Sequence, residues 1–132
     1  WAKLEPLQGL VDLYLYDLKG MDDARHRQHT GVSNRVILEN LEKLAHSGAK
    51  IVIRIPLMAG VNDDAANLEQ TAATLASLPG IQRVDLAPYH EIGSAKYQAL
   101  SRSQPQFQPP APEVLAQAIQ IFERAGLQAQ II

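Results

Sequence analysis

The sequence contains no cysteine, and this absence excludes several kinds of site within its 132 residues. Disulfides, cysteine nucleophiles and thiolate-bound metal centres all need a cysteine side chain. Aromatic residues make up only 5% of the chain, whereas apolar residues make up 46% and charged residues 20%, which is ordinary for a soluble globular protein. The length suits one modest domain or part of a larger one.

The chain also lacks a strong charge of either sign and any long apolar run. A formal net charge of −2 gives no electrostatic case for binding nucleic acid or a membrane surface. No apolar stretch is long enough to span a bilayer. The chain begins at Trp1, without an initiating Met and without a signal peptide, so we expect a fragment or processed chain in the cytoplasm.

Patterns typical of strands alternate with patterns typical of helices. The predicted strands are 11–17, 50–57, 82–87 and 127–131. The predicted helices run from Ser33 to Ser47, from Asp63 or Asp64 to Pro79, and from Pro112 to Gly126. One helical turn is expected within 20–31, and an extended Pro- and Gln-rich loop before Pro110. The order predicts an α/β fold with a parallel sheet and right-handed crossover helices.

Three of these predicted strands carry polar side chains, either within the strand or just after it. Asp17 and Lys19 end the first and project from the same face, because side chains alternate along a strand. Arg54 interrupts the apolar second strand, where a guanidinium needs a carboxylate or a phosphate. His90 follows the third. In a parallel sheet all carboxyl ends meet at the edge where α/β proteins bind ligands, so we expect these four residues to converge.

Simpler interpretations of the same residues stay open. Asp17 can form an ion pair with Lys19 at the strand end or with Arg54 on the next strand. His26 and His29 have H-x-x-H spacing, but no further zinc ligands are evident. The segment Asn62-Asp63-Asp64 is most simply a helix cap.

Four phrases together resemble one enzyme family. In order, over most of residues 11–97, they are YLYDLKGMD, HTGVSNRVILENLEKL, IRIPLMAGVND and APYHEIGSAKY. They resemble the glycyl-radical-enzyme activating enzymes, typified by pyruvate formate-lyase activating enzyme, in the radical S-adenosylmethionine (SAM) superfamily. The resemblance implies that residues 1–132 are the C-terminal half of a partial (β/α)6 TIM-like barrel, from about its fourth strand, without the cluster-binding N-terminal part.

The resemblance also implies roles for the residues at the strand ends. Asp17, Lys19, Arg54 and His90 match SAM-site positions, and Asp17 also matches a position that helps hold a monovalent cation. The complete enzyme would cleave SAM reductively and remove hydrogen from a glycine of a glycyl radical enzyme, such as pyruvate formate-lyase, in anaerobic metabolism. A reductant such as flavodoxin would supply the electron. The family's CxxxCxxC motif, which binds a four-iron–four-sulfur (4Fe-4S) cluster, has no counterpart here, so the chain alone would be inactive.

Two other functions compete with this one. A (β/α)-barrel lyase would use Lys19 as a Schiff-base lysine beside Asp17. A non-catalytic interaction domain would have kept the fold and lost the cluster.

A truncated barrel would expose the inner face of its sheet. The residues that share the predicted site's strand parity, and are therefore expected on that face, are Leu13, Leu15, Val52, Val84 and Leu86. The first strand would also become an open edge, so we expect the chain to self-associate as a homodimer.

Overall fold

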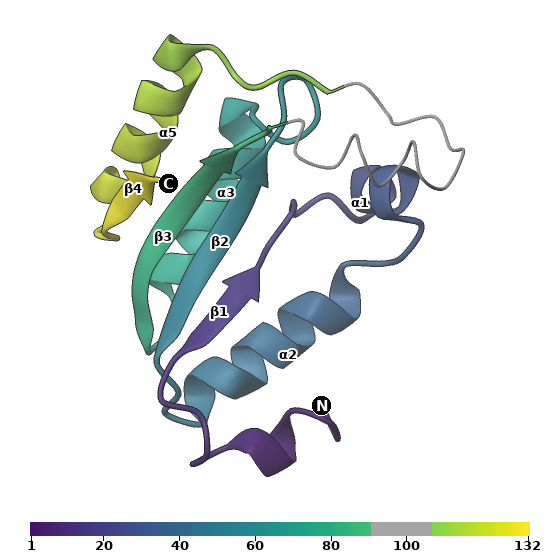
Figure 1. Cartoon of the computed structure of the whole chain (residues 1–132), viewed down its shortest axis with the longest axis vertical. Coiled ribbons are helices and arrows are strands. Elements are labelled where there is room, and N and C mark those ends of the chain that lie inside the picture. Colours follow the sequence, from purple (N-terminus) through teal and green to yellow (C-terminus); the bar gives the residue numbers. More distant parts are fainter. Residues whose placement is uncertain (91–106) are drawn as a thin grey trace.

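A computed structural model describes residues 1–90 and 107–132. Its strands form one four-stranded parallel sheet in the order β1-β2-β3-β4 (Figure 1). They are β1 Tyr14–Asp17, β2 Ile51–Leu57, β3 Ile81–Pro88 and β4 Ala129–Ile131. The predicted strands and their parallel pairing are confirmed. Most of the predicted Pro- and Gln-rich loop, and the end of the phrase APYHEIGSAKY, lie outside the described residues.

Three long helices follow the predicted ranges within a few residues. They are α2 Arg35–His46, α3 Ala65–Ala76 and α5 Pro112–Arg124, and a short 3-10 helix, η1, spans Glu5–Leu7. Helix α1, Asp23–Thr30, is longer than the single turn expected there. The Asp22 carboxylate caps it by accepting from the N–H of Arg25 at 2.8 Å, and Gly31 ends it with a φ of 79°.

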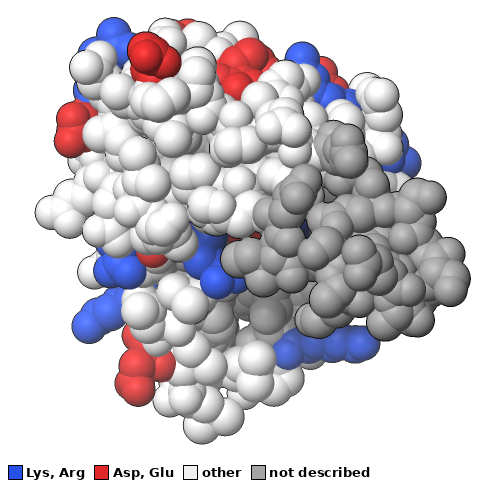
Figure 2. All heavy atoms as spheres, turned by 45° about the horizontal axis from the view of Figure 1, so that its top comes forward, with Lys and Arg blue, Asp and Glu red and all other residues white. Residues whose placement is uncertain are grey.

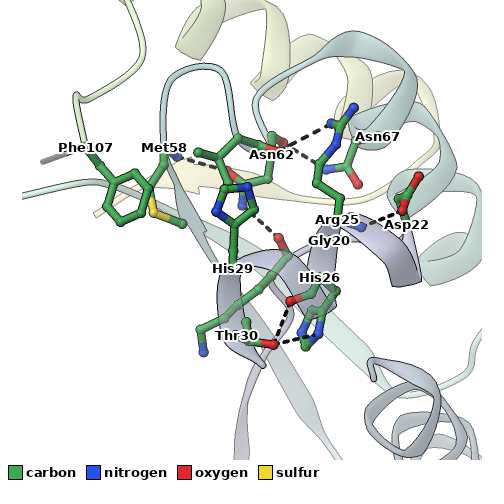
Figure 3. A pocket seen from close by; sticks show the side chains of 12 residues that line it. Gly20, Asp22, Arg25, His26, His29, Thr30, Met58, Asn62, Asn67 and Phe107 are labelled. Atoms are coloured by element: carbon green, nitrogen blue, oxygen red, sulfur yellow. Dashed lines mark hydrogen bonds between the residues drawn. The ribbon is translucent and has the colours of Figure 1, made fainter. Parts of the chain in front are cut away.

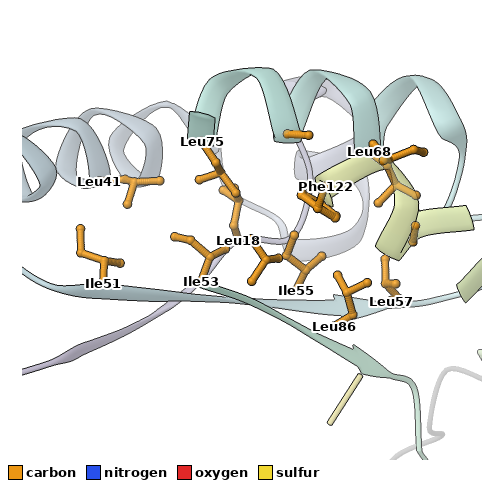
Figure 4. Packing of buried hydrophobic residues seen from close by; sticks show 14 of the residues in the cluster. Leu18, Leu41, Ile51, Ile53, Ile55, Leu57, Leu68, Leu75, Leu86 and Phe122 are labelled. Carbon is orange, nitrogen blue, oxygen red and sulfur yellow. The ribbon is translucent and has the colours of Figure 1, made fainter. Parts of the chain in front are cut away.

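The hydrophobic core lies between the three long helices and one face of the sheet. Strand β2 sends its alternate aliphatic side chains toward the helices, and all of them are buried (Figure 4): Ile51, Ile53, Ile55 and Leu57. They pack with Leu41 of α2, Leu75 of α3 and Phe122 of α5. Because side chains alternate along a strand, Arg54 points to the opposite face, which we call the open face.

The register of β3 corrects the expectation for two of its residues. Ile53 pairs with Val84 and Ile55 pairs with Leu86, and both β3 residues belong to the core. Their predicted place on the open face is therefore wrong. Charged and apolar residues alternate in the β3 sequence Arg-Val-Asp-Leu. Because an unpaired charge beneath the helices is costly, the charged residues lie on the open face instead. On β1, Leu15 pairs with Val52 and is 56% exposed, as an open-face residue, whereas Val52 itself is fully buried, so its expected exposure is wrong.

The connection from α3 to β3 depends on Gly80. Its φ is 81°, and a Cβ atom there would lie 2.2 Å from the carbonyl oxygen of Ala49. The Gly80 carbonyl accepts from the N–H of Ile51 at 2.9 Å, which begins the pairing of β2 with β3. Only a residue without a side chain lets the two backbones approach this closely.

Replacement of Gly80 by alanine should therefore destabilise the fold more than the same change at Gly126. Gly126 has a similar φ of 82° but no atom within 4 Å of the added Cβ, so Gly126→Ala should cost roughly 1–2 kcal/mol of backbone strain. Gly80→Ala should cost roughly 1–3 kcal/mol more, because the backbone has to move. Urea unfolding of both variants measures the difference, and equal destabilisation would contradict the close approach.

Candidate functional site

Three of the predicted site residues meet at the carboxyl edge of the sheet. Asp17 and Arg54 are register partners on β1 and β2. The Nε and Nη2 atoms of Arg54 donate to Oδ1 of Asp17 at 3.0 and 2.7 Å. The Lys19 Nζ atom lies 3.6 Å from Oδ2 of the same carboxylate. The side chains are 39–44% exposed, so this group, the Asp17 cluster, is open to a ligand.

His90 lies at the same edge but is not joined to this cluster. It follows the end of β3 by two residues and is exposed. The preceding N–H, of Tyr89, donates to the carbonyl of Leu57 at 2.9 Å, which ties this backbone to the end of β2. Within the described residues, no hydrogen bond or ion pair links the His90 side chain to Asp17, Lys19 or Arg54.

Asp85, which was not among the predicted site residues, extends the cluster across the sheet. Asp17, Arg54, Asp85 and Gln130 are successive register partners on β1, β2, β3 and β4. Asp85 is 4% exposed and accepts from Arg83 at 2.8 and 3.2 Å and from Gln130 at 2.8 Å. The hydrogen bonds from Arg83 lower the pKa of Asp85, and the charge of Arg54 adds to this effect. In the sequence, the alternation of charged and apolar residues in Arg-Val-Asp-Leu could have indicated that Asp85 lies on the open face.

Asn62 joins the loops that follow β1 and β2. Its Nδ2 donates to the carbonyls of Lys19 at 2.9 Å and Pro56 at 2.7 Å, and its Oδ1 accepts from the N–H of Met58 at 2.9 Å. The side chain is 3% exposed, so these bonds replace its lost hydration. Only Asp64 caps α3, by accepting from the N–H of Asn67 at 3.0 Å. The predicted cap of this segment is therefore confirmed at Asp64, whereas Asn62 has a different role, as a bridge between loops.

Polar contacts also attach α1 beside the Asp17 cluster. Asp23 accepts from the Ser33 hydroxyl at 2.6 Å, the N–H of Asn34 at 2.9 Å and the Arg27 Nε at 2.7 Å. The bond from Ser33, followed by that from Arg27, lowers the pKa of Asp23 to about 2. Another ion pair joins Arg25 of α1 to Asp64 at the start of α3.

A pocket of about 140 Å³ lies between α1 and the loop after β2 (Figure 3). Lys19 of the Asp17 cluster forms part of its wall, and the remaining wall is mostly apolar. Figure 2, with the top of Figure 1 brought forward, shows basic and acidic side chains interspersed on the visible surface. The described residues include no group of three or more His, Cys, Asp or Glu that could hold a metal ion. His26, from the H-x-x-H pair, instead bonds the Val32 carbonyl through Nδ1 at 2.8 Å.

Comparisons with known proteins identify the family. No protein-family model matches the chain. It is 41% identical over 124 residues to the trans-4-hydroxy-L-proline dehydratase activating enzyme of Clostridioides difficile, over 92% of this chain and 41% of that protein. A crystal structure of a domain of pyruvate-formate lyase-activating enzyme from Bacteroides vulgatus matches with a TM-score of 0.84 and 34% identity, over 99% of this chain and 73% of that chain. The chain belongs to the glycyl-radical-enzyme activating enzymes.

These matches cover the relatives only in part. The chain spans about two fifths of the length of the Clostridioides difficile activating enzyme. A radical SAM methyltransferase from Sphaerobacter thermophilus shares the fold, with a TM-score of 0.67 and 21% identity over 89% of this chain and 33% of that chain. Among the helices that the structure describes, none is long and apolar enough to cross a membrane.

Loss of the Asp85 charge should destabilise the chain more than loss of the Asp17 charge. Asp85→Asn leaves Arg83 without its buried carboxylate partner and should cost about 1.5–3 kcal/mol of unfolding free energy. Asp17→Asn disrupts a pair that is about 40% exposed and should cost roughly 0–1 kcal/mol. Urea unfolding at pH 7 compares the two variants. Equal losses of unfolding free energy in the two variants would contradict the role of Asp85 as the buried carboxylate among the four register partners.

Asp23 should titrate well below an ordinary aspartate. Its pKa is about 2 in the folded chain, against an ordinary value of 3.8. Because the folded-state pKa is depressed, Asp23 stabilises the fold fully above about pH 4, and this stabilisation is lost as the pH falls through about 2. The carboxyl carbon shift followed by NMR gives the pKa. In Ser33→Ala the pKa should rise toward 3.8, and an unchanged value would contradict the assigned cause.

Proposed function

We propose that this chain binds SAM at the carboxyl edge of its sheet, within a radical SAM activating enzyme. The Asp17 cluster at that edge is the observation that carries the proposal. SAM has a carboxylate, an ammonium, a sulfonium and ribose hydroxyls, and the cluster offers two cations and one carboxylate at partly exposed positions. The charges and donors of the chain therefore fit this cofactor.

Each side chain then has a distinct part. Lys19 and Arg54 bind anionic or hydroxyl groups of SAM, and Asp17 binds its ammonium or a monovalent cation. Arg54 has five N–H donors, and Asp17 occupies two of its nitrogen atoms, so the guanidinium can hold Asp17 and a ligand together. His90 bonds near the ribose or methionine part. When bound, SAM supplies the radical that removes hydrogen from a glycine, and these residues orient it.

The 4Fe-4S cluster cannot be held by this chain, because its 132 residues include no cysteine to supply thiolates. We therefore assign the chain to the C-terminal half of a partial (β/α)6 barrel, with the cluster-binding part outside it. The complete enzyme would work in the cytoplasm with a reductant such as flavodoxin. Its partner would be a glycyl radical enzyme, the class of partner indicated by the names of its relatives.

The open face supports a further expectation for the isolated chain. Leu13 and Leu15 on that face are 44% and 56% exposed, and β1 is an edge strand of the sheet. Exposed apolar residues beside an unpaired edge favour self-association. We expect the isolated chain to form a homodimer through this face, and light scattering distinguishes it from a monomer.

The Schiff-base function has less support. Such a lysine is usually desolvated in an apolar site or placed beside another cation. The Lys19 side chain is instead 44% exposed and lies beside the carboxylate of Asp17. Trapping by borohydride with carbonyl substrates would identify a Schiff base directly.

Loss of Arg54 should weaken SAM binding in the complete enzyme. After reconstitution of the cluster, Arg54→Ala should raise the KM for SAM roughly 10- to 100-fold, the effect of losing charged hydrogen bonds. Arg35→Ala is the matched control, because Arg35 is an exposed arginine of α2. Formation of 5′-deoxyadenosine measures the reaction. An unchanged KM in Arg54→Ala would remove Arg54 from the site.

The isolated 132-residue chain should show no SAM cleavage under the same conditions. It lacks the cysteines that reconstitution needs, so any weak SAM binding should be unproductive. Turnover by the purified chain would refute its assignment as part of a larger enzyme.

A further inference from the structure

Helix α1 is unusual because almost nothing in it is apolar. Its sequence is DARHRQHT, with Ala24 as the sole aliphatic residue. Most helices of globular proteins are held by an apolar stripe packed on a core. Helix α1 is held instead by its cap and by the polar contacts of Asp23, Arg25 and His26. These contacts position the helix at the site edge without filling the space beneath it.

The pocket described above occupies that space. Met58 and Val61 contribute its apolar wall from the loop after β2, and Phe107 closes one side (Figure 3). The His29 ring meets the ring of Phe107 edge to face, with centroids 6.2 Å apart. Planar rings and a flexible methionine form a wall suited to another ring or to a bulky aliphatic group.

The size of the pocket limits what it can take. Its volume is about 140 Å³. An engineered protein cavity of about 150 Å³ binds benzene, so the pocket has room for one such group. Sites for drug-sized ligands have about 300–1,000 Å³, so a whole SAM molecule is too large. A single amino-acid side chain is the right size.

The position of the pocket indicates where that side chain comes from. Lys19 belongs both to the pocket wall and to the Asp17 cluster, so the two sites are adjacent. A glycine that reacts at the SAM site brings its neighbours in sequence with it. An extended chain advances about 3.3–3.6 Å per residue, so the side chains nearest to the glycine are within reach of the pocket.

We propose that this pocket binds one aromatic or bulky aliphatic side chain of the partner polypeptide, from a residue close to the target glycine. The proposal rests on the proposed function, because that function brings the glycine to the Asp17 cluster. The pocket then acts as a specificity site: it selects partners by the side chain beside their glycine.

Peptide binding to the complete enzyme tests this, with ¹³C-methyl NMR signals of Met58 and Val61 as the probe. The peptides are acetylated, amidated heptamers of serine with a central glycine. Phenylalanine or alanine is placed, one position at a time, at the two residues before and the two residues after the glycine. At one position at least, the phenylalanine peptide should shift both signals and bind about tenfold or more tightly than its alanine counterpart. Equal binding of both peptides at every position would overturn the proposal.

A variant that fills the pocket and a matched control outside it test the same proposal. Val61→Phe should abolish the preference for phenylalanine, whereas Val36→Phe, the same change at a residue that is 54% exposed on α2, should keep it. If Val61→Phe unfolds, Met58→Ala replaces it; enlargement of the pocket should then change the rank order of phenylalanine, leucine and alanine peptides. Loss of preference in Val36→Phe as well, or an unchanged order in Met58→Ala, would overturn the proposal.

The titration needs neither SAM nor the cluster, so it separates this proposal from the proposed function. If the phenylalanine peptide binds but the wild-type enzyme cleaves no SAM, the proposed function fails while the ligand class of the pocket stands. If SAM is cleaved but the peptides bind equally, only the pocket proposal fails. If SAM alone displaces the peptide, as monitored by the Met58 and Val61 signals, the pocket binds the nucleobase and the proposal is overturned.

Discussion

The alternation of side chains along β2 is the constraint on which the rest of the structure depends. Ile51, Ile53, Ile55 and Leu57 bind the sheet to its three long helices, and Arg54 lies between them in sequence but on the other face. The central strand therefore has one face for the core and one for chemistry. A charge in this strand is tolerated because the open face supplies carboxylates on both neighbouring strands.

Carboxylates on either side give Arg54 two different neighbours. Asp17 is partly exposed and bonds to it directly, whereas Asp85 is buried and is held by Arg83 and Gln130. A ligand can compete for the exposed carboxylate more easily than for the buried one. This difference suits the proposed SAM site, in which Asp85 would stay part of the framework while Asp17 and Lys19 exchange partners with the ligand.

The carboxyl edge is built mainly from polar contacts rather than from apolar packing. Asn62 ties together the loops after β1 and β2, and Asp23 and Arg25 attach α1 beside them. Such contacts fix loop positions without filling the space between them. The pocket beside Lys19 lies among these contacts, next to the proposed SAM site.

Local residue patterns determined the strands, the three long helices and their order, because each of these depends on periodicity and on residues close in sequence. The same patterns predicted that Asp17, Lys19 and Arg54 would meet, since the carboxyl ends of parallel strands share one edge. Family membership was also readable from short phrases, and the comparisons confirm it.

Only the tertiary structure decided the facing of Val84 and Leu86, the role of Asp85, the bridge made by Asn62 and the length of α1. The alternation Arg-Val-Asp-Leu indicates which residues of β3 share a face, and the register with β2 decides that Val84 and Leu86 face the core. Asp85 and Asn62 act through partners 45 and 43 residues away in sequence, Gln130 and Lys19. Helix α1 has no apolar periodicity, and its side-chain contacts with Ser33 and Asp64 form only after the chain has folded.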